Sequence, residues 1–286
     1  MHLEFSHPPK VGLVRIALAR KPGVTVGQTF GPLRATLRGH QLGDSPRYRE
    51  LCGFPASGPL PLPWAFVAAA PVQKALLVNK AFPIPLMGMV HIEQLLWARR
   101  PLLPGEPLDL TVSAGAWRPA RRGIHFDLDT AIHDQSGDLV WWGRTVAWSP
   151  AGPGHGEDTP RQPPPELEDP TQHTIDVPGA MGRHYGSVAG DRNPIHVHAW
   201  LARPFGFRKA IVHGMWTLGR SLAAMGEDVP VENVLMHVRF RRPVELPSQG
   251  VLSTAQHNGS LAFRWDSGDQ CCMSGTVAHA DGPPTP

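Results

Sequence analysis

Asp191 and His196 are the two side chains whose types and spacing best suit acid–base chemistry. They lie in the segment YGSVAGDRNPIHVHAWLA, residues 185–202. Asn193 is a favoured helix N-cap and Pro194 a favoured first helical residue, which predicts a helix that begins at Pro194 with His196 in its first turn. A turn followed by a helix start can bring the carboxylate and the imidazole to one cleft. The positive end of the helix favours a neutral imidazole, which is the form that a general base needs.

Two other uses of these residues have to be weighed. The first is a metal site, because His184, His198 and His213 also lie nearby in the sequence. No cysteine or carboxylate stands at zinc-ligand spacing, however, and we expect no metal. The second is a capping turn beside a surface histidine, since D-x-N-P is ordinary loop chemistry. The tyrosine before this motif and the H-G-M run after it favour the functional interpretation.

The same residues match a family signature, which runs aromatic, small residue, then G-D-x-N-P-hydrophobic-H. It is matched here by Tyr185, Gly190, Asp191, Asn193, Pro194, Ile195 and His196, and the run Ile211-Val-His213-Gly214-Met215 follows. With these motifs the segment resembles the MaoC-like dehydratases, the (R)-specific enoyl-CoA hydratases of hotdog fold. The whole chain resembles their double-hotdog form, with a layout similar to that of the mycobacterial 3-hydroxyacyl-thioester dehydratases.

This resemblance implies a mechanism. Asp191 and His196 would hold one water molecule and share the roles of base and acid. Water would add to C3 of a trans-2-enoyl thioester and a proton to C2, giving an (R)-3-hydroxyacyl thioester; the reverse reaction is a dehydration. The backbone N–H of Gly214, at a helix start, suits the enolate-like oxygen that develops. No cofactor is needed, because the thioester itself acidifies C2.

Supporting roles fall to neighbouring residues. Asn193, Gly190 and Tyr185 are expected to shape the loop, since Gly190 lets the backbone bend sharply. His213 is expected to pack or hydrogen-bond beside the cleft. A serine that the family often places on the central helix has no clear counterpart, because Leu222 occupies its position next to Ser221.

Basic residues follow the motif and suggest a partner. Arg203, Arg208 and Lys209, with His213, could contact the thioester substrate through the phosphates of coenzyme A or of an acyl-carrier-protein arm. A solvated basic loop is an equal alternative. Two other functions stay open beside the hydratase: a hotdog acyl-thioesterase, in which water attacks the carbonyl, and a non-catalytic acyl-thioester-binding subunit.

The elements that must position these residues come in two similar sets. Tyr48–Gly53 resembles Tyr185–Gly190 at an offset of 137 positions, and Arg99-Arg100-Pro101 resembles Arg241-Arg242-Pro243 at an offset of 142. A Pro- and Gly-rich stretch separates the sets, and its composition predicts an exposed linker. We therefore expect an N-terminal hotdog over residues 1–148, a linker over 149–173 and a catalytic C-terminal hotdog over 174–286. The N-terminal half has Phe54-Pro55 after its glycine and is expected to be a non-catalytic acyl-chain scaffold.

Each half is expected to contain one long helix and several antiparallel strands, which is an α+β pattern. The helices are predicted over Leu62–Val78 and Ile211–Met225. The strands are predicted over Gly88–Leu96, Leu108–Ala114, Ile124–Ile132, Leu139–Trp148, Val234–Phe240, Gly250–Gln256, Leu261–Trp265 and Gln270–Ala278. Strict alternation supports the third of these strands, and S-G-D at 136–138 and 267–269 predicts a hairpin turn in each half.

Composition narrows the setting. The 286-residue chain is 41% hydrophobic and 18% charged, with a formal net charge of +3 and no long basic run, so no nucleic-acid partner is expected. No apolar run of about 18 residues occurs, and neither a membrane span nor a signal peptide is expected. Three cysteines, two of them adjacent, indicate a reducing compartment, and we expect a cytoplasmic protein. A homodimer is left open.

Overall fold

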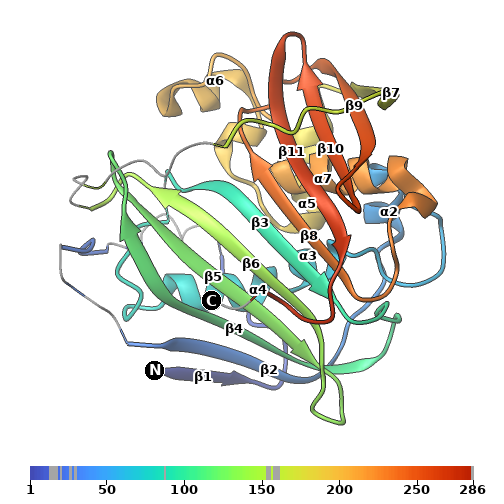
Figure 1. The fold of residues 1–286 in the computed structure, drawn as a ribbon. Helices are drawn as coiled ribbons and strands as arrows, with labels where there is room; N and C mark the ends of the chain where they lie inside the picture. The colour runs from blue at the N-terminus through green and yellow to red at the C-terminus, as the bar shows by residue number, and fades with distance from the viewer. Residues whose placement is uncertain are drawn as a thin grey trace. The chain divides into compact units, whose positions relative to one another are not determined.

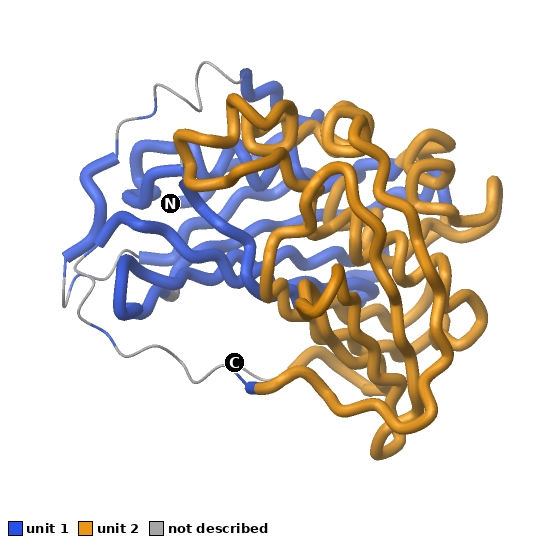
Figure 2. The backbone as a smooth tube through the Cα atoms, turned by 90° about the horizontal axis from the view of Figure 1, so that it is seen from above, with its two compact units in different colours: residues 1–42, 68–95, 104–162 blue, residues 43–67, 96–103, 163–286 orange. Residues whose placement is uncertain are grey.

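The computed structural model describes residues 1–12, 19, 21–25, 28, 31–86, 88–152, 156 and 162–284. The chain forms two compact units (Figure 2). The first contains Met1–Leu42, Ala68–Leu95 and Pro104–Gln162, and the second contains Gly43–Val67, Leu96–Leu103 and Pro163–Pro286. The units therefore differ from the two sequence halves, because segments 43–67 and 96–103 join the second unit. Part of the expected linker lies outside the described residues, and its last three positions begin a strand.

The first unit is built on a sheet whose strand order is β1-β2-β4-β5-β6-β3. β1 pairs with β2 in parallel, whereas the β2–β4, β4–β5 and β5–β6 pairs are antiparallel. The strands are β1 (His2–Phe5), β2 (Leu33–Gln41), β3 (Val90–Ala98), β4 (Pro107–Pro119), β5 (Ile124–His133) and β6 (Leu139–Ser149).

β5 shows why these residues form a half-buried strand. Every second side chain from Ile124 onward is buried, and the residues between them are partly exposed, so one face of the strand packs into the core. Helix α4 (Ala70–Val78) packs against β2 and β4 and buries Val72 and Leu76 completely. The alternation predicted from the sequence is confirmed.

The prediction of a single helix over Leu62–Val78 is wrong. The structure has two helices there, α3 (Trp64–Ala68) and α4, with a break at Ala69. Pro71 explains the break, because a proline ring clashes with the carbonyl four residues earlier and lacks an N–H, yet it is well tolerated in the first turn of a new helix.

The second unit has an antiparallel sheet in the order β8-β11-β10-β9-β7 (Figure 1). Its strands are β7 (Thr171–Val177), β8 (Val234–Phe240), β9 (Ser248–His257), β10 (Ser260–Ser267) and β11 (Gln270–His279). Its α-helices include α2 (Pro46–Cys52), α5 (Met181–Ala189), α6 (Ala199–Ala202) and α7 (Gly214–Met225).

α7 is the central helix of the second unit. The Trp216 ring meets Trp265 of β10 with centroids 6.3 Å apart, and the Trp216 indole N–H donates to the Leu51 carbonyl of α2 at 2.9 Å. The helix was predicted from Ile211 but begins at Gly214. The preceding residues are extended, since Ile211 bridges Glu245 and the Val212 N–H donates to the Val244 carbonyl.

The remaining strand predictions are confirmed with ends shifted by at most two residues, except that β4 continues to Pro119 where the prediction ended at Ala114. Val234–Phe240 matches without change. Both S-G-D hairpin turns are present, with Gly137 and Gly268 at positive φ. The strands β1, β2 and β7 and the helices α2 and α5 were not predicted. The α+β class is confirmed.

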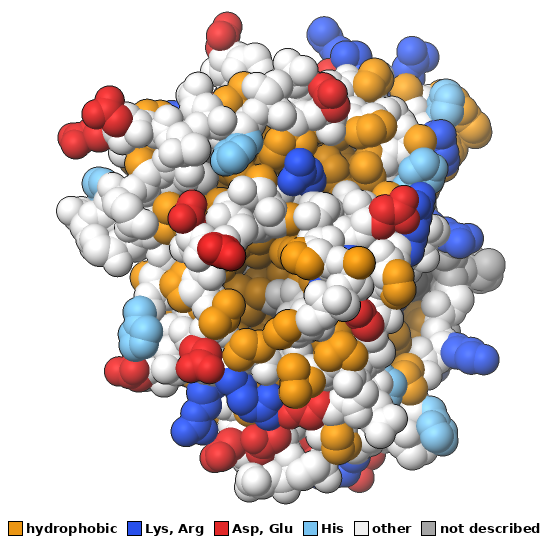
Figure 3. All heavy atoms as spheres, turned by 90° about the vertical axis from the view of Figure 1, so that its right-hand side faces the viewer, with side chains coloured by type: hydrophobic (Ala, Val, Ile, Leu, Met, Phe, Trp, Pro, Cys, Tyr) orange, Lys and Arg blue, Asp and Glu red, His pale blue; other side chains and the backbone are white. Residues whose placement is uncertain are grey.

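No helix within the described residues is long and apolar enough to cross a membrane. On the face drawn in Figure 3, hydrophobic side chains gather around a hollow, and Lys, Arg, Asp and Glu side chains are interspersed around them. Neither positively nor negatively charged side chains dominate that face, in keeping with the small net charge of +3.

Candidate active site

The candidate site begins where helix α5 ends. Gly190 caps the helix in the left-handed conformation, with φ 65° and ψ 13°, a conformation that favours glycine. The Asp191 carboxylate accepts the Asn193 N–H at 3.1 Å, and the Asn193 side chain accepts the Ile195 N–H at 3.4 Å. Asp191 and Asn193 therefore fold the loop onto itself.

The predicted helix start at Pro194 is confirmed, but the helix is not continuous. Pro194–His196 forms a single 3-10 turn capped by Asn193. His198 is extended, with φ −156° and ψ 148°, and caps the separate helix α6. His196 thus ends a short turn rather than standing in the first turn of a long helix.

His196 is held in one tautomer. The residue is only 9% exposed, and its Nδ1 lies 2.8 Å from the Ile211 carbonyl oxygen. A carbonyl can only accept, so Nδ1 carries the proton and Nε2 keeps a lone pair. Burial lowers the pKa of His196 from 6.5, against the raising effect of the Asp191 carboxylate and the Ile211 carbonyl. The side chain is a neutral base at neutral pH.

His213 packs directly on His196. The two rings are stacked with centroids 3.6 Å apart and an angle of 26° between planes. The His213 Nε2–H donates to the Asp191 carbonyl at 2.9 Å, and its buried Nδ1 has no hydrogen-bond partner in the described part of the chain. Burial, then the neighbouring His196, lowers the pKa of His213 to about 3, so this ring is also neutral.

Asp191 completes the cluster from the solvent side. Its side chain is 51% exposed, and its Oδ2 lies 3.8 Å from Nε2 of His213. One ligand-type atom from each of Asp191, His196 and His213 lies within 4.8 Å of the others. A half-exposed carboxylate and a buried neutral imidazole at this separation can share one water molecule.

The same three residues bring together a carboxylate and two imidazoles, which are ligand types that zinc accepts. An imidazole lone pair lies in the ring plane, and zinc sits about 2.1 Å from the nitrogen. The planes of rings stacked 3.6 Å apart and tilted by only 26° do not meet so close to the rings. The pair is therefore poorly arranged to chelate one ion, and the absence of a metal stays a prediction.

Two glycines of α5 make room for the loop, and sequence reasoning missed them. A Cβ on Gly182 would lie 2.1 Å from the His196 carbonyl oxygen, and a Cβ on Gly186 would lie 2.5 Å from the Asp191 carbonyl oxygen. Residues four apart share one helix face. A pair of glycines at this spacing beside the motif was the signal that could have identified them.

Gly214 and Tyr185 flank the cluster. Gly214 is the first residue of α7, where backbone N–H groups have no acceptor within the helix, and a Cβ there would lie 2.8 Å from the Phe240 ring. The Tyr185 ring is buried beside His213, with centroids 5.1 Å apart. Ser221, considered as a third polar residue, instead donates to the Thr217 carbonyl at 2.8 Å within α7.

The basic residues lie on segment 197–210, which follows His196 in the chain and contains no Asp or Glu. The chain on the two sides of this segment is joined by a hydrogen bond from the Ile211 N–H to the Ile195 carbonyl at 3.0 Å. Lys209 pairs with Glu245 at 3.1 Å. The 3-10 turn Arg203–Phe205 lies on this segment, and Trp200 is 62% exposed. Arg208 is exposed on the same segment.

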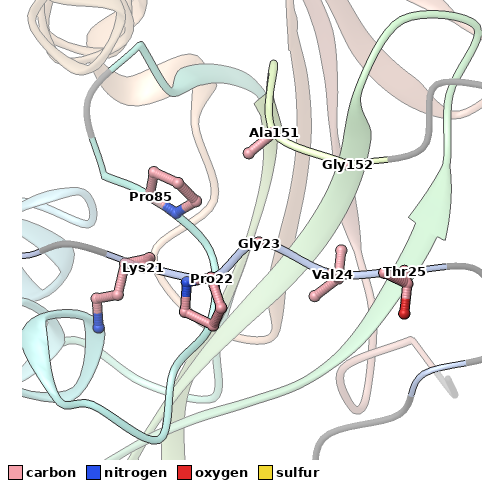
Figure 4. Close-up of a pocket in the computed structure, with 8 residues that line it drawn as sticks. All are labelled: Lys21, Pro22, Gly23, Val24, Thr25, Pro85, Ala151 and Gly152. Atoms are coloured by element: carbon pink, nitrogen blue, oxygen red, sulfur yellow. The ribbon is translucent and has the colours of Figure 1, made fainter.

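A separate cavity of about 410 Å³ lies in the first unit (Figure 4). Residues 21–25 line one side and Pro85, Ala151 and Gly152 the other. The Lys21 ammonium donates to the Asn79 carbonyl and, at 2.8 Å, to the Phe82 carbonyl, and burial lowers its pKa to about 8. None of the candidate site residues lines this cavity.

Comparison with known proteins gives consistent matches. The family model described as MaoC like domain matches residues 159–268. The 3-hydroxyacyl-thioester dehydratase X of Mycobacterium tuberculosis is 31% identical over 222 residues, which cover 77% of this chain and 76% of that protein. The crystal structure of HtdX from the same organism gives a TM-score of 0.72 at 27% identity, covering 86% of this chain and 99% of that one. The MaoC-like dehydratase of Phytophthora capsici gives a TM-score of 0.65 at 18% identity, covering 95% and 100%.

Proposed function

Because the chain belongs to the MaoC-like dehydratase family, we propose that it reversibly hydrates trans-2-enoyl thioesters to (R)-3-hydroxyacyl thioesters. Its chemistry class, that of a 3-hydroxyacyl-thioester dehydratase and thus a hydro-lyase, follows from this membership and from the hotdog fold shared with the relatives. The substrate is accordingly an acyl thioester.

One observation supports the proposal: the Asp191 carboxylate and a ring nitrogen of His196 belong to a cluster whose ligand-type atoms all lie within 4.8 Å of one another. Hydration needs a group that takes a proton from water as its oxygen bonds to C3, and a group that returns a proton to C2. The fixed tautomer of His196 and the half-exposed carboxylate supply such a pair. Proton transfer by positioned groups of this kind contributes about 10²- to 10⁴-fold.

The start of α7 supplies the complementary charge. As water adds to C3, negative charge moves onto the thioester oxygen. The Gly214 N–H, in the first helical turn, is a suitable donor to that oxygen, since helix N-termini favour negative charge. His213 N-caps the same helix, which ties the proposed oxyanion donor to the acid–base pair.

The chain is further proposed to be a double hotdog with one active site. Its support is the internal repeat, in which Phe54 follows Gly53 where Asp191 follows Gly190. Segment 197–210 is proposed to bind the coenzyme A or acyl-carrier-protein end of the substrate. Arg203 and Arg208 can pair with its phosphates, and the segment contains no Asp or Glu.

The test is hydration of crotonyl-CoA, octenoyl-CoA and a long-chain enoyl-CoA, followed by the loss of enoyl absorbance. The expected product is the (R)-3-hydroxyacyl thioester, identified with a dehydrogenase specific for that stereoisomer. Release of free thiol would instead indicate a thioesterase. Binding without turnover by any substrate would indicate a non-catalytic subunit, and either result would overturn the proposal.

A further inference from the structure

His213 is buried and contacts Tyr185, His196 and the main chain of Asp191. Its side chain is 5% exposed and lies between two rings, Tyr185 at a centroid distance of 5.1 Å and His196 at 3.6 Å. A ring packed on both neighbours has little freedom to rotate. Its two nitrogens therefore point in directions that the packing determines.

The Nε2 atom of His213 points to the main chain of Asp191. The His213 Nε2–H donates to the Asp191 carbonyl at 2.9 Å, and Gly186 on α5 lies against the same oxygen. The carbonyl is thus confined between a helix backbone and a hydrogen-bond donor. Fixing this carbonyl fixes the peptide that carries the Asp191 carboxylate.

The second contact is with His196. The segment before α7 holds His196 in two ways: the Ile211 carbonyl accepts the His196 Nδ1–H at 2.8 Å, and the ring of His213 stacks on the imidazole. The hydrogen bond alone leaves the ring free to tilt about its axis. The stacked ring of His213 removes that freedom and sets the direction of the Nε2 lone pair.

We propose that His213 is a positioning residue that sets the relative geometry of Asp191 and His196 without touching the substrate. This inference rests on the proposed function for its kinetic consequences. It differs from a carrier-binding or packing role because it assigns the effect to one donor, Nε2–H. A glutamine can place an amide N–H where Nε2–H stands, whereas a leucine keeps similar bulk without a donor.

The experiment compares His213→Gln and His213→Leu in the full chain with crotonyl-CoA. His213→Leu is expected to lower kcat about 100-fold with KM changed less than about 3-fold, because a displacement near 1 Å can cost this much. His213→Gln is expected to stay within about 5-fold of the wild type. His184→Leu, which removes an exposed imidazole from α5, is the matched control and should leave kcat unchanged.

Equal loss in both His213 variants, or full activity of His213→Leu, would overturn the inference. If His213→Leu loses its circular dichroism signal, Gly186→Ala serves instead, because its Cβ would lie 2.5 Å from the Asp191 carbonyl oxygen and would displace the acceptor of the His213 Nε2–H. The expected result is the same drop in kcat, and unchanged kcat would count against the inference.

A readout independent of activity separates this inference from the proposed function. Imidazole ¹⁵N spectra of the wild type should show His213 protonated at Nε2 and His196 protonated at Nδ1. Protonation of His213 at Nδ1 would overturn the inference even in an active enzyme. An inactive wild type with the expected tautomers would overturn the proposed function and leave the positioning geometry intact.

Discussion

Helices α2 and α5 contain the same landmarks and lead into different chemistry. Tyr48 and Tyr185 correspond at an offset of 137 positions, and each helix ends at a left-handed glycine, Gly53 with φ 84° and Gly190 with φ 65°. The helices contact each other within the second unit, with the two tyrosine rings 6.0 Å apart. The two similar sequence segments therefore form similar helix ends.

The difference begins at the next position along each helix. Arg49 corresponds to Gly186 at the same offset. The Arg49 guanidinium is buried; it pairs with Asp44 at 2.8 Å and donates to the carbonyls of Pro55, Gly58 and Pro59. In α2 a side chain holds the following loop, whereas in α5 the absence of a side chain lets the loop's own Asp191 carbonyl take that space.

The residue after each glycine completes the contrast. Phe54 stacks on Tyr48 with centroids 6.2 Å apart and an angle of 13°, while Asp191 presents a half-exposed carboxylate. The loop after α2 is held by packing and a buried cation, whereas the loop after α5 presents a half-exposed carboxylate. Two similar helix ends therefore lead into loops of different character because a few side chains differ.

The largest expected effect comes from replacing the two candidate proton-transfer residues of the loop that follows α5. Asp191→Asn and His196→Gln should each lower kcat about 10³-fold, because each removes one proton-transfer group. Phe54→Leu, in the first loop, is the matched control and should lower kcat less than about 3-fold. Hydration of crotonyl-CoA is the assay, with circular dichroism to verify folding. Near-wild-type rates for Asp191→Asn would remove the distinction between the loops.

The next effect concerns the first loop. Arg49→Met should lower the free energy of unfolding by about 3 kcal/mol, because it leaves three carbonyls and the Asp44 carboxylate without their buried donor. Urea denaturation measures this change. Arg47→Met, which removes the exposed Arg47–Glu50 pair on the same helix, should cost less than about 1 kcal/mol. Equal costs would show that the buried guanidinium does not fasten the loop.

A smaller effect appears in the pH profile. His196 must be neutral to accept a proton, and its pKa lies below 6.5 because burial outweighs the attraction of Asp191; the stacked His213 is neutral over this range. As pH falls through that lowered pKa, His196 gains a proton and activity is lost. The acid limb of kcat/KM should therefore lie below pH 6.5. A limb at or above 6.5 would mean that the imidazole is more solvated than its burial indicates.

The smallest effect is expected where the two helices are alike. The Tyr185 hydroxyl is buried with no hydrogen-bond partner among the described residues. Tyr185→Phe should therefore change the free energy of unfolding by less than about 1 kcal/mol and kcat by less than about 3-fold, since no bond is lost. A large loss of kcat would reveal that this hydroxyl reaches the substrate, which would make the two tyrosines functionally different.

Much of the fold could be predicted because its signals are local. The alternation of β5, the S-G-D turns and the Asn193–Pro194 cap depend on neighbours within a few residues. Helix α2 was missed because it is short and its tyrosine is buried by contacts with segments far along the chain. The break at Ala69 was missed although Pro71 stood in the sequence to indicate it.

The sequence by itself identified the candidate pair, Asp191 and His196, and the similarity of Tyr48–Gly53 to Tyr185–Gly190, because residue type and spacing are properties of short segments. Only the tertiary structure decided which nitrogen of His196 keeps its lone pair, that His213 stacks on it, and that Arg49 and Gly186 play opposite roles. Those outcomes depend on carbonyls and rings that lie many residues away in the chain, such as Ile211, and reach the site only through folding.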